Sequence, residues 1–268
     1  MTEKPITPGG ALAFIRKNPP LIHNITNYVV MNYTANALLA LGASPVMAHA
    51  PNEVEEMVGL AGALVLNIGT LEDDWIEAMI LAGRAANKRG VPVVLDPVGA
   101  GATRLRTEAA GRLLKETRIA VIRGNASEVL ALGGAATGAR GVDSVDGAES
   151  AAEIAAQLAT DLKVTLAITG PVDLITRGEG LIRVKNGHPL MGRVTGTGCT
   201  ATALIGAFLT AIPDTVDATA AALAFWGLCG ERAGAAHAAP GSFMIGLLDA
   251  LYEIQPEELD ACASLERS

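Results

Sequence analysis

The sequence predicts an α/β fold in which helices cover both faces of a mostly parallel sheet. Short apolar runs alternate with helical patterns, as repeated strand, helix and strand units require. Each run is apolar without interruption, which is typical of strands buried on both faces. Half of the 268 residues are hydrophobic but only 3% are aromatic, and such small side chains suit close packing of helices on a sheet. We expect one domain over residues 1–268, because no linker or internal repeat interrupts the pattern.

The expected elements follow one another along most of the chain. Eight strands are expected, at residues 21–25, 44–47, 63–66, 91–95, 119–122, 164–168, 172–176 and 181–184. The last two flank a turn at residues 177–180, so we expect them to form an antiparallel hairpin at one edge of the sheet. Helices are expected at residues 28–41, 71–88 and 104–115. From Gly198 onward we expect the chain to be almost wholly helical.

Composition and charge exclude several classes of protein. The net charge is −8 and no basic stripe with interleaved aromatic residues occurs, so we expect no nucleic-acid partner. The N-terminus lacks an apolar segment of the signal-peptide type. The apolar stretches at residues 200–212 and 218–230 are too short to span a bilayer, and we expect them to be helices buried in the core or at a subunit contact. Three cysteines without metal-binding spacing favour a reducing, cytoplasmic location.

Four of the expected parallel strands are each followed directly by a polar residue. These residues are Asn67, Asp96, Arg123 and Thr169. Taken singly, each is explained by the turn that follows its strand. Because ligands of open parallel sheets bind outside the carboxyl ends of the strands, four such residues together predict the active site at this edge.

The segment from Val194 to Thr200 opens the long apolar helix and carries the strongest chemical signal. Gly196, Thr197 and Gly198 allow a close backbone approach, and the first N–H groups of a helix are free to bind an anion. This predicts an anion hole for a phosphoryl group, although a glycine-rich helix start capped by Thr197 is an equally good interpretation. Cys199 at the helix start is expected to have a lowered pKa and to act as a weak base or orienting group, unless it is only a small apolar residue under the loop.

A second segment, at residues 123–128, combines charges that suit phosphate and Mg²⁺. Asn125 and Glu128 have capping-box spacing, which explains them without a function. Arg123 and Glu128 also bring a cation and a carboxylate to the sheet edge, where Asp96 could contribute to the same metal site. The sequence has no P-loop and no dinucleotide fingerprint, so we assign phosphate binding to the late helix.

Together these segments resemble a known family. The runs at residues 21–30 (LIHNITNYVV), 96–100 (DPVGA), 123–128 (RGNASE) and 194–199 (VTGTGC) occur in the same order as in hydroxyethylthiazole kinases, and the resemblance covers nearly the whole chain. It implies a ribokinase-like, three-layer α/β/α fold with a mostly parallel central sheet and no separate lid domain. It also implies that ATP phosphorylates hydroxyethyl-methylthiazole in thiamine salvage, in a homotrimer whose active sites lie between neighbouring subunits.

The resemblance also implies roles for individual residues. Met47 and Gly196 resemble the thiazole contacts, Asn24 and Asn27 would line the same pocket, and Arg123 and Thr169 resemble the ATP contacts. Asn125 and Glu128 match the Asn-x-x-Glu element associated with Mg²⁺ and phosphate, with Asp96 as a further metal contact. Cys199 stands where most of the ribokinase-like group carries a catalytic Asp, and thiazole kinases share this difference.

Three rival functions remain at this stage. A ribokinase-like kinase for hydroxymethylpyrimidine or pyridoxal, and a dehydratase that repairs hydrated nicotinamide cofactors, would share the architecture but would be expected to carry Asp in place of Cys199. A binding module that senses ATP or thiazole without turnover would need neither Cys199 nor the complete glycine loop.

Overall fold

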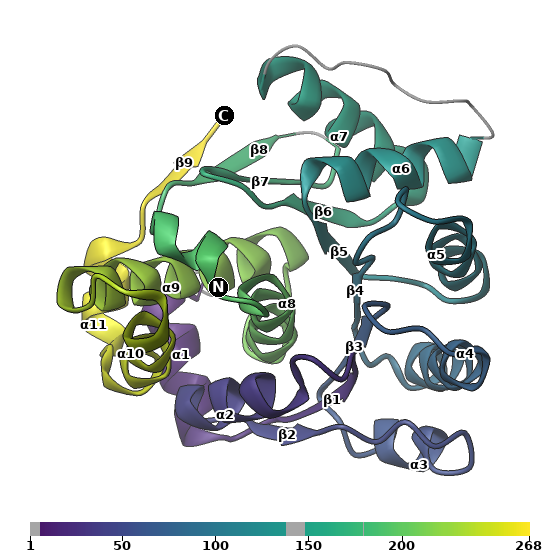
Figure 1. Ribbon diagram of the computed structural model, residues 1–268, viewed down its shortest axis with the longest axis horizontal. Helices are drawn as coiled ribbons and strands as arrows, with labels where there is room; N and C mark the ends of the chain where they lie inside the picture. Colours follow the sequence, from purple (N-terminus) through teal and green to yellow (C-terminus); the bar gives the residue numbers. More distant parts are fainter. Residues whose placement is uncertain (1–5, 138–147, 179) are drawn as a thin grey trace, which may run out of the picture.

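One sheet runs through the molecule (Figure 1). The computed structural model describes residues 6–137, 148–178 and 180–268, and in these residues nine strands are ordered β2-β1-β3-β4-β5-β6-β7-β8-β9. The pairs from β2 to β6 are parallel, and those from β6 to β9 are antiparallel. The strands are β1 (Leu21–Ile25), β2 (Ser44–Val46), β3 (Ala63–Asn67), β4 (Val93–Asp96), β5 (Val121–Gly124), β6 (Thr165–Ile168), β7 (Asp173–Thr176), β8 (Leu181–Val184) and β9 (Leu265–Arg267).

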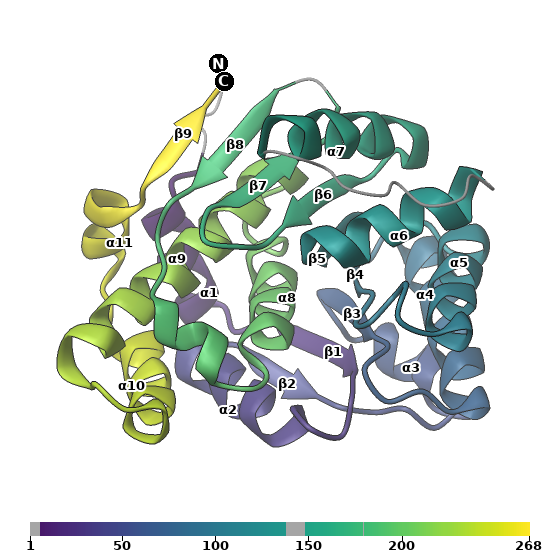
Figure 2. The same ribbon diagram turned by 45° about the horizontal axis from the view of Figure 1, so that its top comes forward.

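Helices cover the sheet on both sides, which gives three layers (Figures 1 and 2). The outer layer holds α3 (Val54–Val58), α4 (Asp73–Arg89), α5 (Arg104–Glu116), α6 (Ala126–Thr137) and α7 (Ala148–Leu162). The inner layer, in the concavity of the sheet, holds α1 (Pro8–Lys17), α2 (Met31–Leu41), the 3₁₀ helix η1 (Pro189–Arg193), α8 (Thr197–Phe208), α9 (Thr215–Ala236), α10 (Pro240–Glu253) and α11 (Pro256–Cys262).

The apolar residues form one core on each face of the sheet. Helix α8 is the centre of the inner core, and its residues 200–208 are all buried. Its close approach to the sheet requires a glycine, because a Cβ at Gly206 would lie 3.1 Å from Cγ2 of Val65 and 3.5 Å from Cγ2 of Ile22. The two apolar stretches expected in the core or at a contact therefore form core helices, α8 and α9. Within the described ranges, no helix is both long enough and apolar enough to cross a membrane.

The structure confirms the presence of all eight expected strands, with bounds that differ by up to two residues, and it corrects three further details. The expected helix at residues 28–41 begins only at Met31, because residues 28–30 form the turn that leads away from β1. The C-terminal part is not wholly helical, since β9 adds an antiparallel strand beside β8. Met47 lies just beyond β2 rather than in it. The expected turn at residues 177–180 includes Glu179, which lies outside the described residues.

Candidate active site

Asp96, the last residue of β4, is the hub of the polar cluster at the carboxyl edge of the sheet. Its carboxylate is fully buried, and Oδ2 accepts hydrogen bonds of 2.9 Å from Asn67 Nδ2 and 2.9 Å from Thr202 Oγ1. Arg123 Nη1 lies 3.7 Å from the same oxygen. Burial raises the pKa of Asp96, and the Arg123 guanidinium and these hydrogen bonds partly oppose that effect. Oδ1 has no hydrogen-bond partner among the described residues, so one buried carboxylate oxygen remains available to a ligand.

Asn27 connects this hub to the start of α8. Its side-chain Nδ2 donates to Asn67 Oδ1 over 2.8 Å and lies 3.5 Å from Cys199 Sγ. The loop after β3 passes close to it, because a Cβ at Gly69 would lie 2.7 Å from Asn27 Nδ2. A chain of hydrogen bonds thus runs from Asp96 through Asn67 and Asn27 to Cys199.

The expectation that Cys199 has a lowered pKa is wrong. The side chain is half-buried in the first turn of α8, and burial together with the Asp96 carboxylate raises the pKa of the thiol to about 11. Hydrogen bonds from Asn67 and Asn27 and the charge of Arg123 lower it, but they do not outweigh burial. At neutral pH Cys199 is therefore a thiol, and its position at the helix start does not make it a thiolate.

The α8 start has the backbone expected of an anion-binding turn. Gly196 has φ +86° and precedes Thr197, and no side chain caps the helix. The interpretation of Thr197 as the cap is wrong, because its Oγ1 donates to the carbonyls of Met191 (3.0 Å) and Val194 (3.3 Å). Trp226 Nε1 donates to the Thr197 carbonyl over 3.0 Å and fixes this turn against α9. The first N–H groups of α8 are thus left without a side-chain acceptor.

Arg123 joins this turn to the neighbouring strands. It lies in β5, and its Nη2 donates to Thr169 Oγ1 over 2.5 Å at the end of β6. A Cβ at Gly198 would lie 2.6 Å from Arg123 Nη1, so the guanidinium lies directly against the backbone of the α8 start. Its Nε is buried and has no hydrogen-bond partner among the described residues. The expectation that Asn67, Asp96, Arg123 and Thr169 meet at one edge is confirmed.

Arg123 and Thr169 open into a cavity of about 510 Å³, a size that suits a small organic ligand. Its lining includes Arg123, Thr169 and Gly198 together with the apolar side chains of Leu223 and Trp226. Asp173 also lines the cavity; its Oδ1 accepts a 2.9 Å hydrogen bond from Gly170 N, and burial raises the pKa of its carboxyl to about 6. Sequence reasoning missed Asp173, since a single Asp in a predicted edge hairpin carries no signal of its own.

Asn125 and Glu128 form the predicted capping box at the start of α6. Asn125 Oδ1 accepts from Glu128 N over 2.9 Å, and Glu128 Oε2 accepts from Asn125 N over 2.8 Å. Glu128 Oε1 also accepts from Gly99 N over 2.9 Å, so this carboxylate joins the loop after β4 to the loop after β5. In the part of the chain that the structure describes, no group of three or more His, Cys, Asp or Glu residues could hold a metal ion.

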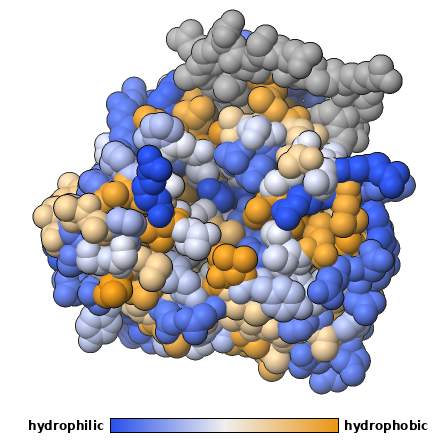
Figure 3. Space-filling view, in the orientation of Figure 1, coloured by the Kyte–Doolittle hydropathy of each residue, from blue (hydrophilic) through white to orange (hydrophobic). Residues whose placement is uncertain are grey.

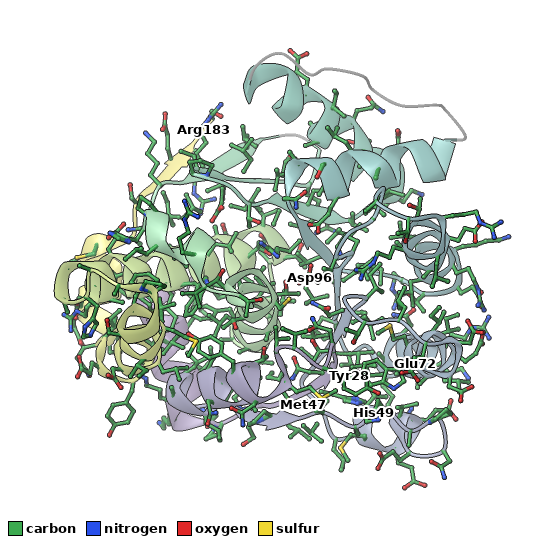
Figure 4. The ribbon with its side chains drawn as sticks, in the orientation of Figure 1. Tyr28, Met47, His49, Glu72, Asp96 and Arg183 are labelled. Carbon is green, nitrogen blue, oxygen red and sulfur yellow. The ribbon has the colours of Figure 1, made fainter. Side chains whose placement is uncertain are left out.

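The residues assigned to a thiazole pocket differ in burial and do not all lie in one cluster. Asn24 is fully buried in β1, where its Nδ2 donates to the Ile22 carbonyl over 2.9 Å, so it lies within the sheet rather than at an open surface. Met47 is half-buried and its carbonyl accepts from His49 Nδ1 over 3.3 Å. Figure 4 shows Asp96 near the middle of the molecule, with Tyr28, Met47 and His49 lying together to one side of it.

An aromatic cluster beside Met47 was not expected from the sequence. The ring centroids of Tyr28 and Trp75 are 4.8 Å apart, and those of His49 and Trp75 are 4.7 Å apart. The three residues come from different loops and helices, so no sequence pattern could have grouped them. Thr202, one helical turn after Gly198, was likewise missed as a partner of Asp96, because it lies within an apolar run.

The whole chain is similar to proteins of one family. The model of the hydroxyethylthiazole kinase family matches residues 12–257. A hydroxyethylthiazole kinase of Desulfotalea psychrophila is 56% identical over 268 residues, which are 100% of this chain and 98% of that protein. The solved structure of a hydroxyethylthiazole kinase from Pyrococcus horikoshii OT3 is 45% identical, with a TM-score of 0.91 over 97% of this chain and 98% of that one.

More distant structures share only the fold. A ribokinase-like superfamily protein from Enterococcus faecalis V583 is 12% identical, with a TM-score of 0.63 over 96% of this chain and 91% of that one. This likeness and the three layers confirm the expected ribokinase-like fold. The family match covers residues 12–257, and the 56% identity is counted over all 268 residues. The chain therefore belongs to the hydroxyethylthiazole kinase family.

Proposed function

We propose that the protein transfers the γ-phosphate of ATP to the hydroxyl of 4-methyl-5-(2-hydroxyethyl)thiazole, a step of thiamine salvage. The observation that carries this proposal is the position of Arg123. Its guanidinium lies between Thr169, the Asp96 carboxylate and the start of α8, in a chain of the hydroxyethylthiazole kinase family. A largely buried cation beside uncapped helix N–H groups is suited to hold and stabilise a phosphoryl group.

ATP would occupy the cavity that Arg123 and Thr169 open into. Its phosphates would reach the start of α8 at Gly198, and its base would lie against apolar lining residues of the cavity such as Leu223. Arg123 keeps a buried Nε without a partner among the described residues, so the guanidinium has a donor left for a phosphate oxygen.

The residues present fit Mg²⁺ as the accompanying ion. Mg²⁺ keeps several waters and is commonly held by one or two carboxylates and the substrate's phosphates, so a three-residue cage is unnecessary. Asp96 offers a buried oxygen without a hydrogen-bond partner in the described residues, and Glu128, with Asn125 nearby, lies close enough to influence the charge of Asp96. When bound, the ion would neutralise charge on the phosphates.

The thiazole would lie on the other side of the α8 start, against Met47, Gly196 and Asn27. Asn27 lies 3.5 Å from Cys199 Sγ, so a hydroxyl in this place would meet the thiol and the amide together. Asn24 stays part of this pocket, because its buried Oδ1 has no hydrogen-bond partner among the described residues and could accept one from a ligand. Cys199, as a thiol, would orient the hydroxyl more than it would remove its proton.

A homotrimer with active sites between subunits is part of the proposal. Tyr28 and Val29, which directly follow Asn27, are 56% and 64% exposed, and Ile245 on α10 is 59% exposed. Exposed large apolar side chains beside a ligand pocket favour cover by a second subunit. The face seen in Figure 3 carries several separate apolar areas between hydrophilic ones. We place the enzyme in the cytoplasm, since its three cysteines are free.

The experiment that tests the function is an assay of ADP release with Mg-ATP and the thiazole, beside hydroxymethylpyrimidine and pyridoxal. ADP formation that depends on the thiazole supports the proposal, and Arg123→Gln should abolish most of it. Turnover only with another alcohol would refute the substrate. Binding of ATP without turnover of any of the three would favour the dehydratase or the sensor. Light scattering should give the mass of three chains of 27.4 kDa, and a monomer with full activity would refute the trimer.

A further inference from the structure

Two neighbouring loops at the sheet edge are both bound by the side chain of Arg106. The loop after β3 follows Asn67, and the loop after β4 follows Asp96. Arg106, in the first turn of α5, donates from Nη1 to the Val98 carbonyl (2.6 Å) and the Ile68 carbonyl (3.4 Å) and from Nη2 to the Gly69 carbonyl (2.7 Å). One guanidinium therefore holds both loops.

The contact is shaped for arginine. Gly99 has φ +72°, and a Cβ there would lie 3.0 Å from both Cδ and Nη1 of Arg106, so the loop backbone lies directly against the side chain. The planar guanidinium has five donors in a fixed arrangement, whereas a lysine ammonium is a single point of charge. Lysine could reach one or two of these carbonyls but could not reproduce the bridge.

Arg106 is not explained by the stability of its own helix. A cation in the first turn opposes the helix dipole, and the cap is supplied by Thr103, whose Oγ1 accepts from Arg106 N over 3.3 Å. Its neighbour Arg104 shares the turn, but its side chain is 89% exposed and pairs with Glu108 at 3.8 Å. The two arginines therefore differ in the feature that matters, contact with the loops.

A second side chain, that of Glu128, also holds the loop after β4. Glu128 Oε1 accepts from Gly99 N, one residue after the carbonyl that Arg106 binds. The turn itself is closed by Val98 N, which donates to the Asp96 carbonyl over 2.9 Å, and Ile68 N donates to the same carbonyl over 3.2 Å. Movement of either loop would thus alter the place of Asp96.

We propose that Arg106 is a positioning residue for phosphoryl transfer: it fixes Asp96 and Asn67 relative to each other through the two loops and touches no substrate. The inference rests on the proposed function for its substrate, not for its geometry. Displacement of a catalytic group by about 1 Å can cost on the order of 100-fold in rate, so a loosened bridge should appear in kcat.

The test compares Arg106→Gln and Arg106→Lys with the matched control Arg104→Gln. The assay uses the full-length protein and whichever alcohol the wild type phosphorylates, so a wrong thiazole assignment shows in the wild type and leaves this test intact. We expect Arg106→Gln to lower kcat about 10- to 100-fold, with the KM of the alcohol changed less than about threefold, and to raise the Mg²⁺ concentration needed for half-maximal rate. Arg106→Lys should recover part of kcat, and Arg104→Gln should match the wild type.

Three outcomes would overturn the inference. One is a folded Arg106→Gln protein with kcat within about twofold of the wild type. Another is a lowered melting temperature in both Arg106 variants with kcat and Mg²⁺ dependence unchanged per folded molecule, which would assign Arg106 to stability alone. The third is failure of both variants to fold, which would also assign Arg106 to stability alone.

Discussion

The protonation state of Cys199 gives the sharpest quantitative prediction about the site. Burial and the Asp96 carboxylate raise the pKa of the thiol from 9.0 to about 11. At pH 7.5 a thiol with the unperturbed pKa of 9.0 would be about 3% thiolate. Cys199, with a pKa of about 11, would be about 0.03% thiolate. Since the thiolate is the form that reacts with alkylating agents, Cys199 should react about 100-fold more slowly than its ordinary pKa would allow.

Alkylation by iodoacetamide, followed peptide by peptide with mass spectrometry, measures this directly. Cys262 is exposed and serves as the internal reference, and Cys229 is buried and should remain unlabelled in the native protein. Restricted access alone would slow Cys199 equally at every pH, so the decisive observation is the pH profile. The rate at Cys199 should still be rising above pH 10. A profile that levels off near pH 8 or below would refute the reasoning and restore Cys199 as a thiolate base.

Three further changes test the proposed phosphate and metal contacts and the protonation of the cavity carboxyl Asp173. Gly198→Ala places a Cβ 2.6 Å from Arg123 Nη1, so the guanidinium must shift. The KM of ATP should rise at least tenfold, because a charged hydrogen bond contributes about 1.5–3 kcal/mol and this one would be displaced. A steady-state titration with ATP measures the KM. Asp96→Asn can keep both hydrogen bonds to Oδ2 but loses the charge, so kcat should fall by about 100-fold or more in a Mg²⁺ titration while circular dichroism stays unchanged. Asp173 has a folded-state pKa of about 6 against 3.8, so it binds its proton more tightly when folded, and its contribution to stability is lost as pH rises from about 4 to about 6. Asp173→Asn should therefore raise the free energy of unfolding above pH 6 by at most about 3 kcal/mol, and by nothing below pH 4, in urea titrations at the two pH values.

Strands that are buried on both faces could be predicted from the sequence, because such burial produces a continuous apolar run. β3 and β4 are continuous apolar runs because helices cover both their faces, and such runs can be recognised without knowing their partners. β9 could not be recognised in this way. Its three residues, Leu265–Arg267, lie at the sheet edge with two of them exposed, and they pair with β8, which lies some 80 residues earlier in the chain. Pairing at such a distance leaves no local signal.

The candidate site also has one part that the sequence predicts and one part that it does not. Asn67, Asp96, Arg123 and Thr169 could be grouped from the sequence, since parallel strands bring their carboxyl ends to one edge. The contacts that tune these residues could not be foreseen, because they depend on side-chain direction. Arg106 reaches the two loops only through the way α5 packs, and nothing in its local sequence distinguishes it from Arg104.

The position of Cys199 could be predicted from the sequence, but the direction of its pKa shift could not. A helix start lowers the pKa of a thiol when water or a cation faces it, and the sequence places Cys199 at such a start. In the fold the thiol is half-buried near the Asp96 carboxylate, and both effects favour the neutral form. Phosphoryl transfer tolerates this, because its loose transition state needs little early removal of the hydroxyl proton. In the proposed mechanism the larger share of catalysis would then fall to groups that hold charge in place, namely Arg123 and the N–H groups at the start of α8, and the Cys199 thiol would only orient the attacking oxygen.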